Sequence, residues 1–421
     1  MTPAAALAAA LGALPAGAPT RLGVAVSGGS DSLALLVLAA DWARARGADL
    51  YAVSVDHGLR PEAAAECAQV AVQAAALGIP HQTLRWRDWD GQGNLQAAAR
   101  RARQRLIADW AIARGLRHVA LAHTLDDQAE TVLLRLARGS GVDGLSAMAP
   151  MRRDPAADLI WLRPLLGVRR AALRSLLAER GLVWSDDPGN ADNRFDRVKA
   201  RAVLADPPLP GLGPERLAET AERMSAARLV LDRVARQAAD RLARTAYGAV
   251  SFDAAGLTGL PDDTRWRLLS AALRLVSGDP YRPRLSALRR AEETALGSGR
   301  SATLLGCILQ PARGGRLWVL REPAALRPGP VPGLWDGRWR IDGPAEGAVL
   351  VAPLGEAGLA EAGDWRALGV PHKLALGLPG IWQNGRLRAA PVLDPPPPAG
   401  PAWTATAVWD PGRLSVTLIP D

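Results

Sequence analysis

A short stretch of small polar residues, from Ser27 to Ser32, carries the clearest chemical signal in the chain. It lies between an apolar run at 22–26 and a second apolar run at 33–38, and it reads Ser27-Gly28-Gly29-Ser30-Asp31-Ser32. A strand, a small-residue turn and a helix start present backbone N–H groups to a ligand at the positive end of the helix dipole. Glycines permit close approach, serines add donors, and Asp31 can hold a cation or cap the helix. The segment therefore predicts a phosphate-binding loop, with a capped tight turn as the alternative.

A second group of polar residues follows an expected strand at 118–122. His123, Asp126, Asp127 and Glu130 share one face of a helix that would begin near residue 124. Three carboxylates and an imidazole on one face are electrostatically costly, so we expect a compensating cation: Mg²⁺, a substrate ammonium, or both. An acidic helix N-terminus that suits the dipole is the alternative, but it accounts for neither His123 nor Glu130.

These groups must be positioned by regular elements, and the first 200 residues alternate strand and helix patterns. We expect strands at 22–26, 50–55, 81–86 and 118–122, separated by helices at about 31–45, 61–77 and 94–114. This alternation predicts an α/β fold with a parallel sheet, which binds ligands at the carboxyl ends of its strands. Asp56 and His57 follow the second strand, and Asp56 is placed to bind the ribose or the adenine edge of a nucleotide.

The pattern changes further along the chain. We expect an α/β domain at 1–205 and a helical domain at 206–322, because continuous Ala, Leu, Arg and Glu residues recur there at helical spacing. Prolines make 323–333 a stiff linker, and short strand-like runs with turns predict a small α+β domain at 334–421.

Composition narrows the partners. Lys and Arg exceed Asp and Glu by 51 to 42, a net charge of +9, and only Lys199 and Lys373 are lysines. An Arg-rich basic chain favours a polyanionic partner. Two distant cysteines, Cys67 and Cys307, argue against a disulfide framework or a paired-thiol site and fit a reducing cytoplasm. We expect no signal peptide and no membrane partner, since no apolar stretch is long enough to span a bilayer.

Together these residues resemble one family. The phosphate loop resembles that of the ATP-pyrophosphatase superfamily. The full set is similar to the tRNA(Ile)-lysidine synthetases over about residues 20–201, with a weak further likeness at 369–387. The motifs are S-G-G-S-D-S, V-D-H-G-L-R-P, N-L-Q-A-A-A-R-x-x-R, A-H-T-L-D-D-Q-A-E-T-V-L-L-R-L-x-R-G-S-G and R-P-L-L, with Trp184–Asn190 and Phe195–Arg197. Val198 departs from the family, which usually carries Asn there.

The resemblance implies an adenine nucleotide α-hydrolase-like, Rossmann-like first domain and two tRNA-contacting domains. It implies a ligase: ATP adenylates C2 of the wobble cytidine in isoleucine tRNA with a CAU anticodon, and free L-lysine displaces AMP. The modified tRNA would then read the codon AUA instead of AUG. Asp31 would help to place Mg²⁺, and Arg103 and His123 would face the base. Asp127 and Glu130 would bind lysine or metal, and Ser27, Gly28, Gly29, Ser30 and Ser32 would hold ATP phosphates.

Three other functions stay open at this point. A relative that transfers sulfur to a tRNA base would need a reactive cysteine beside the loop. A non-catalytic tRNA-binding protein with a relic ATP site would have lost Asp31 or the acidic face. A small-molecule synthetase would have little use for two further domains. The sequence leaves the oligomeric state open, with a homodimer as one alternative.

Overall fold

The chain is described by a computed structural model that covers residues 1–58, 62–87, 89, 91, 95–154, 158–185, 196–344, 349–394, 402–409 and 414. Parts of the family motifs, at Leu59–Pro61, Asn94 and 186–195, lie outside these residues, as does the proline run at 395–398. The chain forms two compact units, Met1–Arg228 and Leu229–Pro420, and the division falls within helix α9 (Pro214–Leu242).

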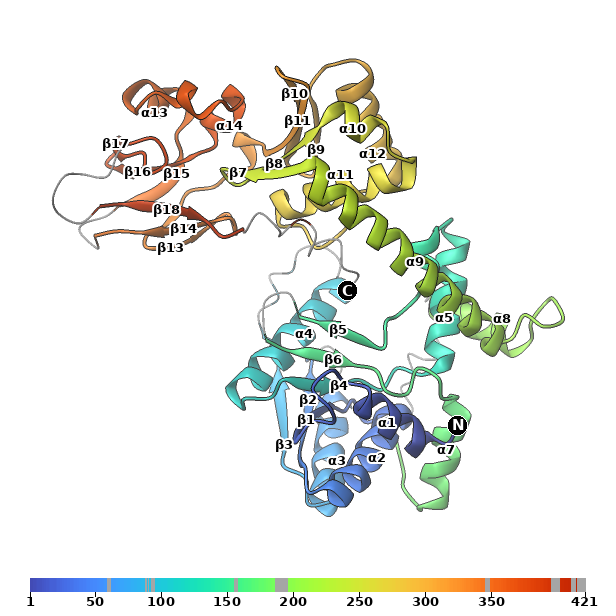
Figure 1. Cartoon of the computed structure of the whole chain (residues 1–421). Coiled ribbons are helices and arrows are strands. Elements are labelled where there is room, and N and C mark those ends of the chain that lie inside the picture. Colours follow the sequence, from blue (N-terminus) through green and yellow to red (C-terminus); the bar gives the residue numbers. More distant parts are fainter. Residues whose placement is uncertain are drawn as a thin grey trace. The chain divides into compact units, whose positions relative to one another are not determined.

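The first unit contains a six-stranded sheet in the order β3-β2-β1-β4-β6-β5 (Figure 1). All neighbours are parallel except the edge pair β5–β6. The predicted parallel sheet is therefore confirmed, and the four predicted strands lie within two residues of their expected positions. The strands are β1 (Arg21–Ala25), β2 (Asp49–Asp56), β3 (His81–Arg85), β4 (His118–Ala120), β5 (Met151–Arg153) and β6 (Ile160–Leu162).

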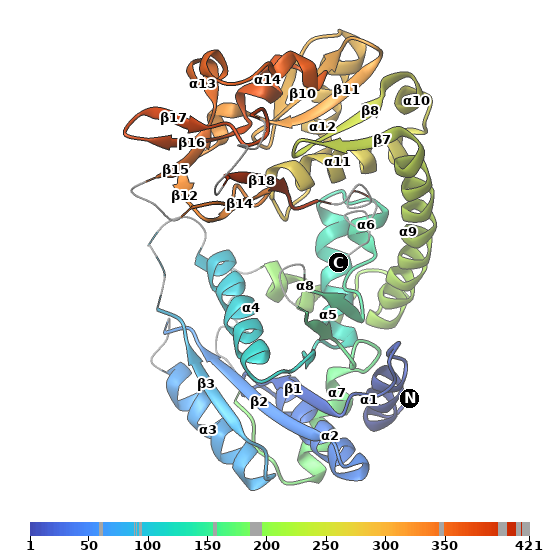
Figure 2. The ribbon, with the colours of Figure 1, turned by 60° about the vertical axis from the view of Figure 1, so that its left-hand side comes forward.

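Helices cover both faces of this sheet (Figure 2). One core joins Leu22 and Val24 of β1 to α1, α2, α3 and α7, and another joins Val53 of β2 and Val119 of β4 to α4. Burial of both faces is what a parallel sheet requires. The helices are α1 (Pro3–Gly12), α2 (Ser30–Arg46), α3 (Glu62–Ala76), α4 (Leu95–Ala113), α5 (Leu125–Ala137), α6 (Val142–Leu145), α7 (Arg170–Glu179) and α8 (Asp196–Ala205).

The second unit corrects the expectation of an all-helical middle region. Besides α10 (Ala254–Thr258), α11 (Asp262–Ser277), α12 (Leu285–Glu292) and the π-helical turn η2 (Glu293–Gly297), it holds an antiparallel sheet in the order β7-β8-β11-β10-β9. The strands are β7 (Ala243–Ala246), β8 (Ala249–Asp253), β9 (Ala302–Leu304), β10 (Cys307–Ala312) and β11 (Arg316–Arg321).

Two tight turns connect neighbouring strands of this sheet, and neither turn has the sequence that usually predicts a hairpin. Tyr247-Gly248 and Leu305-Gly306 each have two successive positive φ angles, 50° and 65° and then 53° and 63°. That geometry belongs to two-residue hairpin turns, for which Asn-Gly or Asp-Gly is the usual signal. In addition, β8 pairs with β11 across more than sixty residues, so its strand form depends on tertiary pairing.

The remaining residues confirm the predicted mixture of helices and strands. One sheet has the order β12-β15-β16-β17 and another β13-β14-β18. Their core includes Ile308, Trp318 and Leu320 of the five-stranded sheet, and η3 and β12 lie within the segment predicted to be a linker. The elements are η3 (Pro323–Ala325), β12 (Gly329–Pro330), β13 (Gly333–Trp335), β14 (Trp339–Asp342), β15 (Leu350–Pro353), α13 (Gly355–Glu361), η4 (Trp365–Leu368), α14 (His372–Leu376), β16 (Pro379–Gln383), β17 (Arg386–Ala389) and β18 (Thr404–Ala407).

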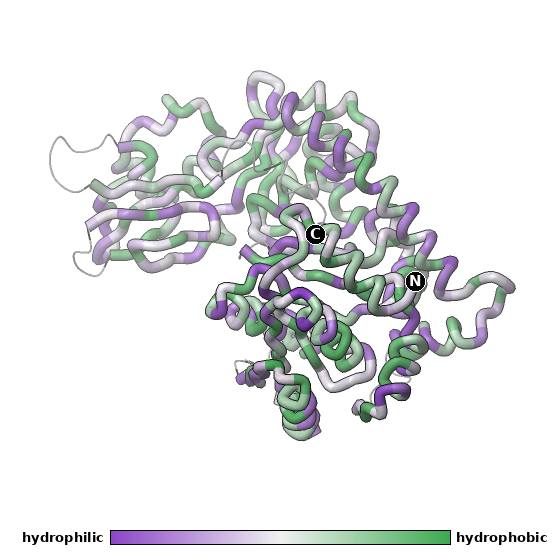
Figure 3. The backbone as a smooth tube through the Cα atoms, turned by 60° about the horizontal axis from the view of Figure 1, so that its bottom comes forward, coloured by the Kyte–Doolittle hydropathy of each residue, from purple (hydrophilic) through white to green (hydrophobic). Residues whose placement is uncertain are grey.

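Hydrophilic and hydrophobic residues alternate along the helical coils of the backbone (Figure 3). Among the described residues, no helix is both long enough and apolar enough to cross a membrane. The predicted domain boundaries at 205, 322 and 333 remain a prediction.

Candidate active site

The predicted phosphate loop connects β1 to the first turn of α2. Gly29 is the N-cap of this helix, and Gly28 has a φ of 91°, a left-handed conformation that favours glycine. The Ser27 N–H donates to Ser32 Oγ at 3.1 Å, and Ser32 Oγ donates to the Gly29 carbonyl at 3.0 Å. These bonds wrap the loop around the helix start, where the first N–H groups have no acceptor within the helix.

A second segment holds this loop from outside. The Ser185 N–H donates to the Gly28 carbonyl at 3.0 Å, and Ser185 Oγ donates to Gln69 Oε1 at 3.1 Å. One turn further along α3, Gln73 Nε2 donates to the Val183 carbonyl at 2.7 Å. The carbonyl side of the loop is thus occupied by protein. Sequence reasoning singled out the motif that contains Ser185 without assigning it this contact.

The acidic helix begins where the sequence predicted. Thr124 is the N-cap of α5, and Asp127 completes a capping box with it. Asp127 Oδ2 accepts from the Thr124 N–H at 2.8 Å and from Thr124 Oγ1 at 2.9 Å, while the Asp127 N–H donates to Thr124 Oγ1 at 3.3 Å. One carboxylate oxygen of Asp127 is therefore fixed by its own helix start.

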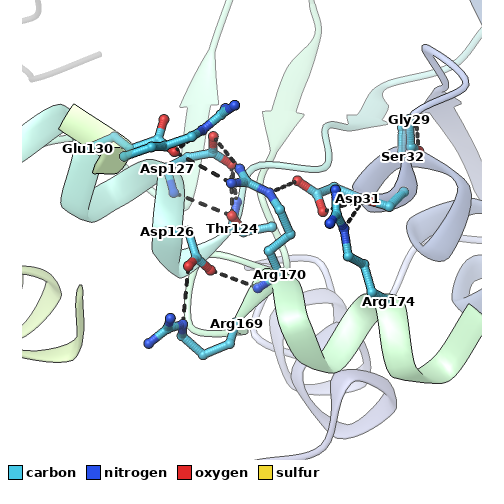
Figure 4. Close-up of polar contacts among 12 residues, drawn as sticks. Gly29, Asp31, Ser32, Thr124, Asp126, Asp127, Glu130, Arg169, Arg170 and Arg174 are labelled. Atoms are coloured by element: carbon cyan, nitrogen blue, oxygen red, sulfur yellow. Dashed lines mark hydrogen bonds and ion pairs between the residues drawn. The ribbon is translucent and has the colours of Figure 1, made fainter. Parts of the chain in front are cut away.

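The cation that compensates this acidic face within the structure belongs to the chain itself. Arg170 Nε donates to Asp31 Oδ2 at 2.8 Å, Nη2 donates to Asp127 Oδ1 at 3.1 Å, and Nη1 lies 3.5 Å from Glu130 Oε1 (Figure 4). Arg170 is the first residue of α7, a position at which the helix dipole disfavours a cation. Arg169 and Arg170 follow the R-P-L-L motif, and no sequence pattern assigned this role to Arg170.

Two members of the predicted acidic face point to other partners. Glu130 is 1% exposed, and its Oε1 accepts from Arg201 Nε at 2.7 Å, while its buried Oε2 has no hydrogen-bond partner among the described residues. Asp126 accepts from the Arg170 backbone N–H at 2.7 Å and pairs with Arg169. The shared helical face predicted for these residues is thus divided between several arginine partners.

Burial and arginine neighbours set the charge states. Burial raises the pKa of Asp31, although Arg170 opposes the shift. Burial acts in the same direction on Asp127, but Arg170 and the Thr124 hydrogen bonds outweigh it and hold the pKa of Asp127 below its usual value. Burial, with a further contribution from Arg163, lowers the pKa of His123 to about 4. At neutral pH, Asp127 is therefore ionised and His123 is neutral.

These elements open on one cavity of about 940 Å³. Its lining includes residues at the carboxyl ends of β1, β2, β4 and β6, where an open α/β sheet binds ligands, together with residues of α3, α4, α7 and α8. Of the predicted site residues, Ser27, Gly29, Ser30, Asp31, Ser32, Arg103, His123 and Asp127 line it.

Three predicted site residues do not line the cavity. Gly28 makes the left-handed turn of the phosphate loop, and Glu130 is buried. Asp56 accepts the Gly58 N–H at 2.9 Å at the end of β2. The neighbouring His57 lines the cavity instead.

Arginines form much of the cavity wall, which favours anionic ligands. Burial lowers the pKa of Arg103, and it lowers the pKa of Arg163 to about 10, so Arg163 keeps its charge at neutral pH. Among the arginines of the wall, sequence reasoning assigned a site role only to Arg103. The arginines on the wall are Arg100, Arg103, Arg163, Arg170, Arg174, Arg197 and Arg201.

Cys67 also lines the cavity, which the sequence did not indicate. Burial raises the pKa of its thiol, and Asp56 and Glu66 add to that shift. A thiol is a nucleophile only as its thiolate, so this environment is unlike that of a reactive cysteine.

Comparisons of sequence and structure relate this chain to known proteins. A family described as the PP-loop domain matches residues 6–206. A tRNA(Ile)-lysidine synthase from Ruegeria pomeroyi is 45% identical over 92% of this chain and 91% of its own. One from Hyphomonas neptunium is 40% identical over 78% of this chain and 88% of its own. Among solved structures, a U34-tRNA thiolase from Methanococcus maripaludis matches 53% of this chain and 78% of its own at 17% identity and a TM-score of 0.46.

Proposed function

Because this chain belongs to the tRNA(Ile)-lysidine synthase family, we propose that it joins lysine to isoleucine tRNA in the cavity at the carboxyl edge of its six-stranded sheet. It ligates free lysine to C2 of the wobble cytidine of the CAU anticodon through an adenylated cytidine, with release of AMP and pyrophosphate. The tRNA then reads AUA instead of AUG. One observation supports this site most: the phosphate loop and the acidic helix start open on the same cavity.

Adenylation is assigned to the loop side of the cavity. Gly28 makes the left-handed turn, and Ser27, Gly29, Ser30 and Ser32 supply hydroxyl and backbone donors at the positive end of α2. Fixed donors of this kind stabilise the charge that develops on phosphate as the bond between the α and β phosphates breaks. Two further residues on the cavity wall, Arg103 and His123, are assigned to the cytidine and its adenylate.

Mg²⁺ is proposed as the ion that accompanies ATP. In proteins it is bound through one or two carboxylates together with substrate phosphates, and Asp31 provides such a carboxylate on the cavity wall. When bound, the ion would neutralise charge on the phosphates. Glu130 fits this role less well, because its side chain is 1% exposed and its Oε1 accepts from Arg201.

Lysine is assigned to the Asp127 side of the cavity. Asp127 is ionised and lines the cavity, so it can bind and orient the ε-ammonium group. The neutral ring of His123 has a buried Nδ1 with no partner among the described residues, which leaves a polar atom for the reacting groups. Glu130 would act through Arg170 and Arg201 rather than on lysine itself.

The tRNA is assigned to the arginines of the cavity wall other than Arg170 and to surfaces of the second unit. Binding of a polyanion agrees with the net charge of +9. A cytoplasmic location and a homodimer remain part of the proposal.

Lysidine formation with purified protein tests the function. Labelled lysine should enter a CAU-anticodon isoleucine tRNA transcript in the presence of ATP, with one AMP and one pyrophosphate released per lysine. A matched transcript with uridine at the wobble position should accept none. ATP–pyrophosphate exchange that requires lysine but no tRNA would contradict the proposal, because lysine rather than cytidine would then be the adenylated group.

A further inference from the structure

We propose that Arg170 is a positioning residue that holds the phosphate loop and the acidic helix in one arrangement, so that both half-reactions depend on it. The inference rests on the function proposed above and assigns this residue a role that no sequence motif gave it.

Three contacts of Arg170 join two separate elements. Asp31 lies in the first turn of α2, whereas Asp127 and Glu130 lie on α5, and the guanidinium reaches all three (Figure 4). Its backbone N–H donates to Asp126 Oδ2 at 2.7 Å, so carboxylates hold both the backbone and the guanidinium group of Arg170. The side chain is 20% exposed, which limits screening by water.

The charge balance explains why a cation is needed at this point. The carboxylates of Asp31, Asp127 and Glu130 face the guanidiniums of Arg170 and Arg201, which leaves one net negative charge. Without Arg170 the cluster would carry two, and like charges in a poorly hydrated site repel strongly. Asp31 and Asp127 would then move apart, although one is assigned to ATP and the other to lysine.

The arrangement of the three donor nitrogens of the Arg170 guanidinium matters as well as its charge. Nε, Nη1 and Nη2 are each directed to a different carboxylate. A lysine at this position would keep the charge but present a compact ammonium on a flexible stem, which cannot reproduce the planar fork. Because every nitrogen of the guanidinium already faces a carboxylate, we expect Arg170 to act through these side chains rather than to bind phosphate.

Single-turnover assays of the two half-reactions test this proposal in the full-length protein. Arg170→Met should slow both adenylate formation and lysine transfer by ~10²-fold, the order expected when reacting groups are misplaced by about 1 Å. The KM for ATP should change much less than the rates. Arg170→Lys should recover part of each rate, and added guanidinium ion should partly restore Arg170→Ala.

Arg169→Met is the matched control. Arg169 is the neighbouring residue and also pairs with acidic side chains, Asp126 and Glu215, but it does not line the cavity. Its variant should stay within a few-fold of wild type and show no response to guanidinium. Melting temperatures of all variants, measured in parallel, separate an unfolded protein from a folded one whose site is misarranged.

Several results would overturn the inference. Unchanged rates in Arg170→Met would do so, as would a raised KM for ATP at an unchanged rate, which would identify a direct phosphate ligand. Full recovery by Arg170→Lys would reduce the role to charge alone. Loss of activity only in proportion to unfolded protein would make it structural. Wild-type protein that forms no lysidine would instead refute the proposed function, independently of Arg170.

Discussion

Replacement of Asp127 by Asn tests the centre of the site with a minimal change of shape. In the wild-type protein, Oδ2 accepts two hydrogen bonds from Thr124 and Oδ1 accepts one from Arg170. An asparagine keeps only one acceptor oxygen. If that oxygen stays with Thr124, the new NH₂ group faces the Arg170 donor, and two donors confront each other at about the present 3.1 Å.

The expected loss of stability follows from the contacts that remain. A hydrogen bond to a charged group contributes about 1.5–3 kcal/mol. An uncompensated buried charge costs about 3–5 kcal/mol. That cost does not apply in full here, because Arg170 would keep its ion pairs with Asp31 and Glu130. We therefore expect a loss of about 2–3 kcal/mol in the free energy of unfolding. For a unit of this size that corresponds to a melting temperature lower by roughly 4–12 °C.

The same change should separate lysine use from adenylation. Removal of one charged partner of the ε-ammonium should raise the KM for lysine by ~10- to 100-fold, since about 1.4 kcal/mol corresponds to a factor of ten. Lysine-independent adenylate formation should fall less than lysine transfer, because Arg170 keeps its contacts with Asp31 and Glu130. Thermal unfolding and single-turnover assays with labelled ATP and labelled lysine measure the two effects. Wild-type stability together with wild-type rates in both half-reactions would refute this account of Asp127.

Four further predictions concern other parts of the chain. Asp31→Ala should slow adenylation by ~10²-fold or more while the protein stays folded, and unchanged turnover would contradict the assignment of the loop. Gly28→Ala should raise the KM for ATP, because its φ of 91° strains any other residue by about 1–2 kcal/mol, although the added Cβ would approach Val70 no closer than 3.6 Å. The pKa of about 4 for His123, against 6.5 when unfolded, means that the unfolded chain takes up a proton first as the pH falls. Stability should therefore decline from pH 6.5 to 4, by up to roughly 3 kcal/mol, and His123→Gln should flatten that part of the curve measured by urea titration. Replacing the exposed Arg366 and Lys373 by Ala should weaken tRNA binding and reduce its salt slope by about one for each phosphate that is no longer neutralised, whereas ATP binding should not change.

Local patterns were enough to predict the phosphate loop. Its residues lie between an apolar strand and an apolar helix, and the loop depends on glycine at a left-handed position and on the helix start, both of which are properties of adjacent residues. The start of α5 was predictable for the same reason, because the Thr124–Asp127 capping box is complete within four residues.

Two features could not be predicted in this way. The five-stranded sheet of the second unit depends on pairing between β8 and β11, and a long charged helical pattern masked its short strands. The partner of the acidic face was also hidden. The sequence indicated that a cation must balance these carboxylates, but Arg170 lies some forty residues further along the chain and at a helix end that disfavours cations.

Residues close together in the chain were sufficient to specify the chemistry available to this protein: a phosphate loop, an acidic helix start and an excess of arginine. Which of these groups face one another depends on how the elements pack. Packing placed Asp31 and Asp127 on one cavity, left Glu130 and Asp56 out of its lining, and supplied Arg170 as a common counterion of Asp31, Asp127 and Glu130. Contacts of this kind join distant residues through the packing of α2, α5 and α7, and no local pattern specifies them.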